Sequence, residues 1–180
     1  SSDPVTVYLS AMRRLRSPSV ATVEAALYDD RSIVRHHAMR RTLWVTTPEM
    51  APVLHAASTL ALVGPDRRRT VQWMLASGLV ADADAADRWI DAGIDELVAE
   101  IDRRGETTAR ELGEALPHLT AEIGVVTDKS YGGLMPAHTR LLTIMGFMGL
   151  IVRGRPLGTW INAQYRWATT ARWLGSAWPE

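Results

Sequence analysis

Hydrophobic and polar positions along most of the 180 residues recur with the 3.6-residue period of an α-helix. Apolar residues fall on one helical stripe over residues 4–15, and Ser19 stands where it can cap a second helix. The clearest amphipathic pattern covers residues 81–104, where large apolar side chains share one side and acidic side chains occupy the other. The pattern therefore predicts a mainly helical chain.

Two pairs of short segments instead carry the residues that are typical of β-strands. Residues 32–35 and 42–46 follow the first two predicted helices, and residues 150–153 and 165–167 enclose a turn-rich stretch, residues 154–158. Each pair predicts an antiparallel hairpin. The expected fold class is therefore α+β and mostly helical.

Signals for helix ends place a helix-turn-helix ahead of the second hairpin. Thr108 and Glu111 have the spacing of a capping box at the start of a short helix, and Pro136 opens a helix that runs to Gly149. Two helices followed by a hairpin are the plan of a helix-turn-helix with a wing. The loop of residues 116–135 is longer than such a turn usually needs.

The order helix, helix, hairpin occurs twice, although no tandem sequence repeat is visible. We therefore expect tandem winged-helix units, each a helix-turn-helix plus β-hairpin wing, joined by a helical layer. Residues 1–46 are the predicted N-terminal winged-helix-like unit, and residues 47–80 are a helical connector interrupted at Gly64-Pro65. Residues 81–180 are the predicted second winged-helix domain, with its wing at about residues 150–168.

Composition narrows the class of protein. Hydrophobic residues make up 47% of the chain, enough for a core and too many for an intrinsically disordered chain. The absence of cysteine excludes disulfide frameworks, thiolate zinc sites and cysteine nucleophiles. No run of about 18 apolar residues or charged-then-apolar leader is present, so the expected compartment is the cytoplasm, beside the nucleoid when DNA is bound.

The formal net charge of zero hides a strong asymmetry along the chain. Residues 1–80 hold ten bases and six acids, a balance of +4, and residues 136–180 hold five bases and one acid, also +4. Residues 81–135 hold five bases and thirteen acids, a balance of −8. Two basic regions therefore flank an acidic one, and both basic regions are candidates to contact phosphates.

Candidate DNA contacts lie on the two hairpins and on the helix before the second one. A basic hairpin tip can follow a groove and contact phosphates, and the exposed side of a recognition helix carries short polar residues and Arg. The predicted DNA contacts are Arg35, His36, Arg40, Arg41, Arg140, Thr143, Arg153, Arg155 and Arg166. Neighbouring residues on a strand face opposite sides, so His36 and His37 are not expected to share a metal, and no metal or cofactor is predicted. Surface histidines are the simpler interpretation of both.

Two segments carry a resemblance to a known family. Residues 34–44 read Val-Arg-His-His-Ala-Met-Arg-Arg-Thr-Leu-Trp, and residues 149–160 are followed by Gln-Tyr-Arg-Trp at residues 164–167. The sequence resembles the bacterial AlkZ/YcaQ-type winged-helix DNA-binding family, whose members share a Met-Arg-Gly-Thr-Leu-His-like strand and a Gln-Tyr-x-Trp-like wing strand. The family glycine is Arg41 here and the family histidine is Trp44.

The resemblance implies a monofunctional glycosylase that removes alkylated purines or unhooks crosslinked bases from double-stranded DNA. Family members position the attacking water with a Gln-x-Gln or Gln-x-Asp motif just before the segment that resembles residues 3–9. Either that motif lies upstream of Ser1, or Ser2 stands at its second position; Asp3 is the only acid beside the motif position. Asp3 is the catalytic candidate, although an N-cap ahead of Pro4 is the stronger interpretation of this residue.

Other functions remain open at this stage. A non-catalytic DNA-binding transcriptional regulator or a protein-interaction winged-helix module would show the same patterns. Enzymes that bind nucleotides through a Gly-rich loop and hydrolases with a nucleophile elbow are disfavoured, because neither motif occurs. The family proteins are longer at both ends, so the chain is expected to be a fragment of a longer protein. The sequence names no lesion, operator or oligomeric state.

Overall fold

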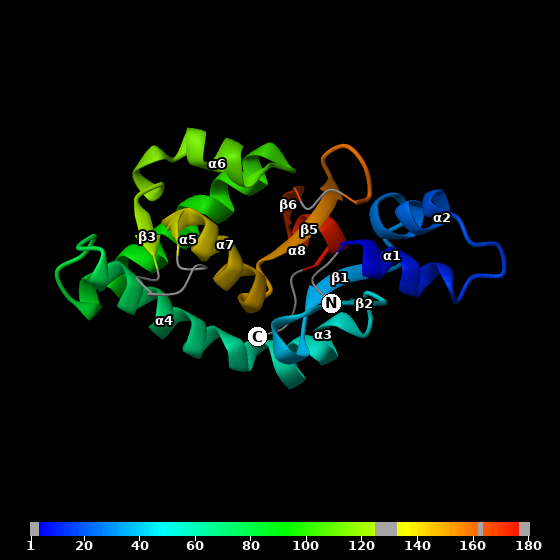
Figure 1. Ribbon diagram of the computed structural model, residues 1–180, viewed down its shortest axis with the longest axis horizontal. Coiled ribbons are helices and arrows are strands. Elements are labelled where there is room, and N and C mark those ends of the chain that lie inside the picture. The colour runs from blue at the N-terminus through cyan, green and yellow to red at the C-terminus, as the bar shows by residue number, and fades with distance from the viewer. Residues whose placement is uncertain (1–3, 125–132, 162–163, 177–180) are drawn as a thin grey trace.

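A computed structural model describes residues 4–124, 133–161 and 164–176 (Figure 1). None of the helices described there is long and apolar enough to cross a membrane. The first half contains α1 (Pro4–Met12), α2 (Val20–Glu24), η1 (Ala25–Asp29), β1 (Val34–His37), η2 (Met39–Arg41), β2 (Leu43–Thr46), α3 (Ala51–Leu54), η3 (His55–Thr59), η4 (Leu60–Leu62) and α4 (Val63–Ala76). The second half contains α5 (Ala83–Arg104), α6 (Ala109–Ala115), η5 (Pro117–Leu119), β3 (Glu122–Gly124), β4 (Leu134–Pro136), α7 (Ala137–Met148), β5 (Ile151–Pro156), β6 (Tyr165–Thr169) and α8 (Thr170–Leu174). The predicted α+β, mostly helical class is confirmed.

Local signals in the first half act as the sequence predicted. The hydroxyl of Ser19 accepts a hydrogen bond from the backbone N–H of Thr22 at 3.0 Å and caps α2, which continues directly into the π-helical turn η1. Strands β1 and β2 pair in antiparallel fashion, with Val34 opposite Thr46. Both predicted helices and the first hairpin are therefore confirmed.

The layer between the hairpin and α5 is more continuous than the sequence suggested. Helical turns run without a gap from α3 through η3 and η4 into α4, and the break expected at Gly64-Pro65 is absent. Pro65 falls in the first turn of α4, where its missing N–H removes no helical hydrogen bond. Proline at that position is compatible with the helix and does not interrupt it.

Helix ends in the second half follow the capping signals closely. The Asp82 side chain accepts a hydrogen bond from the N–H of Ala85 and caps α5, and Thr108 and Glu111 form both hydrogen bonds of the predicted capping box. Gly149 ends α7 with a φ of +75°, a conformation that favours glycine. The predicted long loop instead contains the turn η5 and the short antiparallel pair β3–β4.

The hairpin β5–β6 belongs to two hydrophobic cores at once. Ile151 and Trp167 pack into the larger core with α4, α5, α6 and α7, whereas their neighbours Val152 and Ala168 pack into the core of α1, α2, η1 and β1. Successive strand residues face opposite sides, which allows one hairpin to serve both cores. The proposed units 1–46 and 81–180 therefore share a core, and the division into three units remains a prediction.

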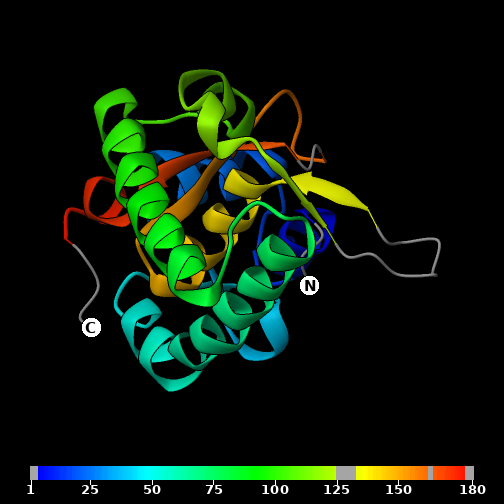
Figure 2. The ribbon, with the colours of Figure 1, turned by 90° about the vertical axis from the view of Figure 1, so that its left-hand side faces the viewer.

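Helix α7 lies at the centre of the larger core, with α4, α5 and α6 around it (Figure 2). Gly93 on α5 allows the close packing of α5 on α7. A Cβ atom at Gly93 would lie 2.7 Å from Cδ1 of Leu141 and 3.3 Å from Cδ2 of Leu119. The absence of a side chain at this position therefore sets how near α7 sits to α5.

Replacement of Gly93 by valine is expected to lower the free energy of unfolding by about 1–3 kcal/mol, because the added atoms overpack the α5–α7 contact. The matched control is Ala92→Val, at an exposed position of the same helix, for which a change below about 1 kcal/mol is expected. Urea denaturation measures both. Equal losses for the two variants would contradict the packing role of Gly93.

Candidate nucleic-acid interface

Most of α7 is buried, and one side of it remains accessible. Thr139, Arg140 and Thr143 are partly exposed, whereas Leu141, Leu142 and the positions from Ile144 to Phe147 are buried. The three accessible residues are polar and lie within one turn of each other on the helix. This is the side on which the sequence placed Arg140 and Thr143 as candidate contacts.

Three guanidinium groups surround one buried carboxylate next to the accessible side of α7. Asp66 on α4 is 1% exposed and forms ion pairs with Arg140, with Arg41 at 3.3 Å and with Arg69 at 3.9 Å. The guanidinium of Arg140 also lies over the ring of Trp73, at 4.9 Å. Three cations around one anion leave two positive charges in excess.

The members of this arginine cluster, defined as Arg41, Arg69 and Arg140 around Asp66, differ in their exposure to solvent. The Arg140 side chain is 13% exposed, and burial is the largest cause of a lowered pKa, opposed by the attraction of Asp66. Arg41 and Arg69 are 34% and 45% exposed and face solvent. Asp66 and Arg140 thus form a buried ion pair, and the guanidinium groups of Arg41 and Arg69 beside it are accessible to solvent.

Arg41 holds an unusual backbone conformation. Its φ is +58°, in the left-handed region that glycine tolerates best. The family strand that this segment resembles carries glycine at the position, so the backbone shape agrees with that glycine while Arg41 adds a cation. Arg40 lies in the same turn η2, and its side chain is outside the described part of the structure.

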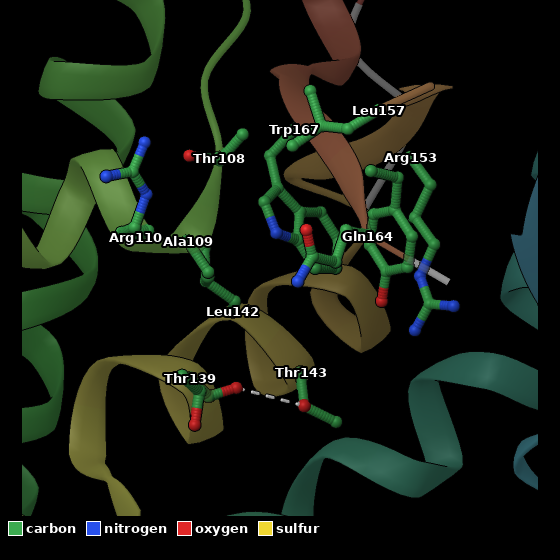
Figure 3. Close-up of a pocket in the computed structure, with 11 residues that line it drawn as sticks. Thr108, Ala109, Arg110, Thr139, Leu142, Thr143, Arg153, Leu157, Gln164 and Trp167 are labelled. Carbon is green, nitrogen blue, oxygen red and sulfur yellow. Dashed lines mark hydrogen bonds between the residues drawn. The ribbon is translucent and has the colours of Figure 1, made fainter. Parts of the chain in front are cut away.

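A pocket of about 380 Å³ opens on the other flank of the accessible side of α7 (Figure 3). Thr139 and Thr143 project into it from α7, and the start of α6 closes one end with Arg110. The β5–β6 hairpin supplies the opposite wall, where Arg153 and Trp167 lie. The pocket and the arginine cluster therefore flank the same helix.

Arg153 lines this pocket and forms no ion pair with any residue that the structure describes. Its guanidinium lies over the ring of Tyr165 at 4.2 Å and near that of Trp167 at 5.5 Å. Burial is the main cause of its lowered pKa, and its buried Nε has no hydrogen-bond partner in the described residues. Aromatic faces attract the cation but do not neutralise it.

The two other arginines of the second hairpin lie beside acidic residues from distant parts of the chain. Arg155 forms ion pairs with Asp29 at 2.7 Å and Glu24 at 3.5 Å. Arg155 and Arg166 line a second hollow together with Asp29 and Glu106. In the sequence this hairpin has no acid near it, so the folded chain reduces the positive charge that the sequence indicated.

The candidates on β1 are buried, which differs from the exposure that a DNA contact requires. Arg35 is 4% exposed and donates a hydrogen bond to the carbonyl of Gly154 at 3.0 Å, so it ties β1 to β5. His36 is 3% exposed and lies 3.3 Å from His55, measured between ring nitrogens, and 3.2 Å from the Thr59 hydroxyl. His37 packs edge-on against Phe147. The interpretation of His36 and His37 as surface histidines is wrong, because α7 and η3 cover β1.

Two predictions from the sequence remain: the catalytic residue and the absence of a metal site. Asp3, the catalytic candidate, lies outside the described residues. Over residues 4–124, 133–161 and 164–176, no group of three or more His, Asp or Glu side chains is arranged to hold a metal ion.

Sequence reasoning missed Asp66 and Trp73, the groups that organise the arginine cluster. Asp66 is separated by 74 residues from Arg140, and no local motif joins the two positions. The run Arg67-Arg68-Arg69 was the one available signal, since three cations at a helix start oppose the helix dipole. Within α4 the i, i+3 spacing brings Arg69 to Asp66, whereas the packing of α4 on α7 brings Arg140 there.

The structure therefore has a basic surface beside α7. The comparisons with known proteins identify the class of protein as a DNA glycosylase family. The family model described as DNA glycosylase AlkZ-like matches residues 1–180, so the chain belongs to the AlkZ-like family. A search of curated protein sequences finds no match.

A solved structure is similar over nearly the whole chain. It is the Streptomyces sahachiroi DNA glycosylase AlkZ, with a TM-score of 0.57 and 22% sequence identity. The match covers 96% of this chain and 41% of AlkZ. At this identity the likeness shows a shared fold, and the chain spans less than half the length of AlkZ.

The buried histidines make stability depend on pH. Burial, aided by His55 and His37, lowers the pKa of His36 from 6.5 to about 3, and burial with Arg153 nearby lowers that of His37 to about 3. The folded state therefore favours the neutral rings, so the stability they confer is present above pH 6.5 and is lost as pH falls toward 3. Between pH 6.5 and 5, each histidine is expected to contribute a slope of up to about 1.4 kcal/mol per pH unit.

Urea unfolding at half-unit pH steps measures this slope. His36→Gln keeps a polar group near Thr59 but does not titrate, so its slope between pH 6.5 and 5 is expected to be smaller than that of the wild type. Identical slopes in the two proteins would show that His36 is not neutral in the folded state.

Proposed function

We propose that this chain is a DNA-binding part of an AlkZ-like repair protein and that it contacts duplex DNA with the accessible side of α7 and the arginine cluster. The observation that carries the proposal is that cluster, in a chain whose whole length matches a DNA glycosylase family. In this proposal α6, α7 and the β5–β6 hairpin form a winged-helix module, with α7 as its recognition helix.

The charge balance of the cluster supports phosphate contact. Asp66 neutralises one of three guanidinium groups, and the remaining charge is held in place by ion pairs and by the ring of Trp73. Cations that are already ordered lose less conformational entropy when a phosphate arrives. Arg41 and Arg69, the more exposed members, would meet the backbone, while Thr143 on the same side of α7 would approach the base edges.

In this proposal the arginines of the β5–β6 hairpin have different roles. Arg166 remains a candidate phosphate contact at the rim of the hairpin, whereas Arg155 is held by Asp29 and Glu24 and would have to exchange those partners for a phosphate. Arg35 and His36 are given structural roles instead of contacts because both are buried.

Base excision is the catalytic part of the proposal. The similar Streptomyces protein is named a DNA glycosylase, and we infer that a complete protein containing this chain removes alkylated or crosslinked bases from duplex DNA. Hydrolysis of the N-glycosidic bond needs a group that orients water near the sugar while the base departs. Such a group would belong to the motif that precedes Pro4, to which Asp3 is adjacent.

Duplex binding by the 180-residue chain is expected to weaken steeply with salt, because phosphate contacts release counter-ions. In the double variant Arg41→Gln, Arg69→Gln, the slope of log affinity against log salt is expected to fall in magnitude by about 2, since each phosphate contact contributes about 0.9. Fluorescence anisotropy of a labelled, undamaged duplex across a salt series measures both slopes.

The matched control for this experiment is the double variant Arg103→Gln, Arg104→Gln. It removes the same charge from the C-terminal end of α5, where both side chains pair with Glu100. Its salt slope is expected to equal that of the wild type. Equal slopes in all three proteins, or no binding at low salt, would overturn the proposed interface, and a preference for one undamaged sequence would favour a transcriptional regulator.

Catalysis is tested by base release from a duplex that carries N7-methylguanine, with the complete product of the gene compared with this chain. Release is expected from the complete protein when a glutamine-containing motif precedes Asp3. Substitution of that motif by alanine is expected to abolish release while duplex affinity changes less than tenfold. If the complete protein releases no alkylated base, the enzymatic part of the proposal fails and DNA binding stands alone.

A further inference from the structure

The pocket beside α7 contains a positive charge that none of the described acidic residues neutralises. Arg153 has no acidic partner among the described residues, and no acidic side chain lines the pocket in that part of the chain. The Arg35 guanidinium adds repulsion instead of attraction. A cation removed from water without a counter-ion destabilises a fold. The Arg35 guanidinium is buried as well, but it donates to the Gly154 carbonyl and ties β1 to β5, whereas the Arg153 side chain makes no hydrogen bond with a described residue, so its position calls for a purpose other than stability.

Arg155, two residues further along β5, differs from Arg153 in its charged partners. Arg155 is more exposed to water and nevertheless has two acidic partners, Asp29 and Glu24. Arg153 is more deeply placed, and its partners in the described part of the chain are the rings of Tyr165 and Trp167. The missing negative charge at Arg153 is therefore a local property of the pocket and not of the whole hairpin.

The walls of the pocket indicate what could supply that charge. Leu142, Leu157 and Trp167 give it apolar and aromatic surface suited to a flat ring. The hydroxyl groups of Thr139 and Thr143 donate to backbone carbonyls of α7 and its start, which leaves their oxygens as acceptors for an amino group. A volume of about 380 Å³ is at the lower end of small-molecule sites, which span about 300–1,000 Å³.

We propose that this pocket binds a single nucleotide unit of a DNA strand, with the phosphate at Arg153 and an amino-bearing base between the threonines of α7 and Trp167. An anion, a flat ring and an amino donor together match the cation, the aromatic wall and the two hydroxyl acceptors. The choice of a nucleotide as ligand rests on the proposed DNA-binding function. The site itself is distinct from the arginine cluster, which needs only backbone phosphates.

The test uses the complete 180-residue chain and deoxyadenosine 5′-monophosphate, so that it does not depend on duplex binding. Indole N–H signals of the seven tryptophans are followed by NMR, and the signal of Trp167 is identified with Trp167→Phe. The mononucleotide is expected to shift that signal in a saturable way. Deoxyadenosine and inorganic phosphate, each tested alone, are expected to bind at least about tenfold more weakly, because each lacks one half of the contacts.

The decisive variant is Arg153→Gln, which keeps a polar side chain and removes the charge. Its affinity for the mononucleotide is expected to fall by about tenfold or more, while its melting temperature stays the same or rises because an unpaired cation is gone. Arg103→Gln, an exposed charge on α5 paired with Glu100, removes the same net charge and is expected to leave the nucleotide affinity unchanged.

Each result decides the proposal. Saturable binding that depends on Arg153 supports it, even if the chain fails to bind duplex DNA and the proposed interface falls. Unchanged affinity in Arg153→Gln, or a fall in its melting temperature without loss of binding, would make Arg153 a structural residue and overturn the proposal. Equal affinities for phosphate and mononucleotide would reduce the pocket to an anion site, and no shift of the Trp167 signal would refute it.

Discussion

The packing of one two-stranded hairpin between two hydrophobic cores determines most of this structure. Ile151 and Trp167 enter one core, and Val152 and Ala168 enter the other. Because the alternation of a strand fixes both sets together, a shift of one residue in register would misplace both cores. The same hairpin carries Arg153 and holds Arg35 through the carbonyl of Gly154, so the pocket wall is positioned by the packing that holds the two halves together.

Arginine serves three physical roles in the chain, and its surroundings decide which. Arg155 is neutralised by acids on the N-terminal segment, and Arg140 shares the buried Asp66 with two more exposed cations. Arg153 has aromatic rings and no acid among the described residues. The positive charge left unpaired after folding therefore differs from the basic regions counted along the sequence, and part of it lies beside the accessible side of α7 at Arg41 and Arg69.

Sequence patterns predicted the local elements well and the side-chain environments poorly. Helix caps at Ser19 and Thr108, the glycine stop at Gly149 and both main hairpins depend on neighbouring residues, and all of them form as expected. The burial of Arg35 and His36 and the pairing of Asp66 with Arg140 depend on contacts between segments far apart in the chain. A basic residue on a hairpin looks the same in the sequence whether a helix covers it or water does.

The hairpin shared by the two cores also affects how the protein unfolds. Separation of β5–β6 from either core would expose apolar side chains of that core and loosen the strands that complete the other one. We therefore expect the two halves to unfold together as one cooperative unit. Such cooperativity would let a ligand held against β5 protect helices at the opposite end of the chain from local opening and proteolysis.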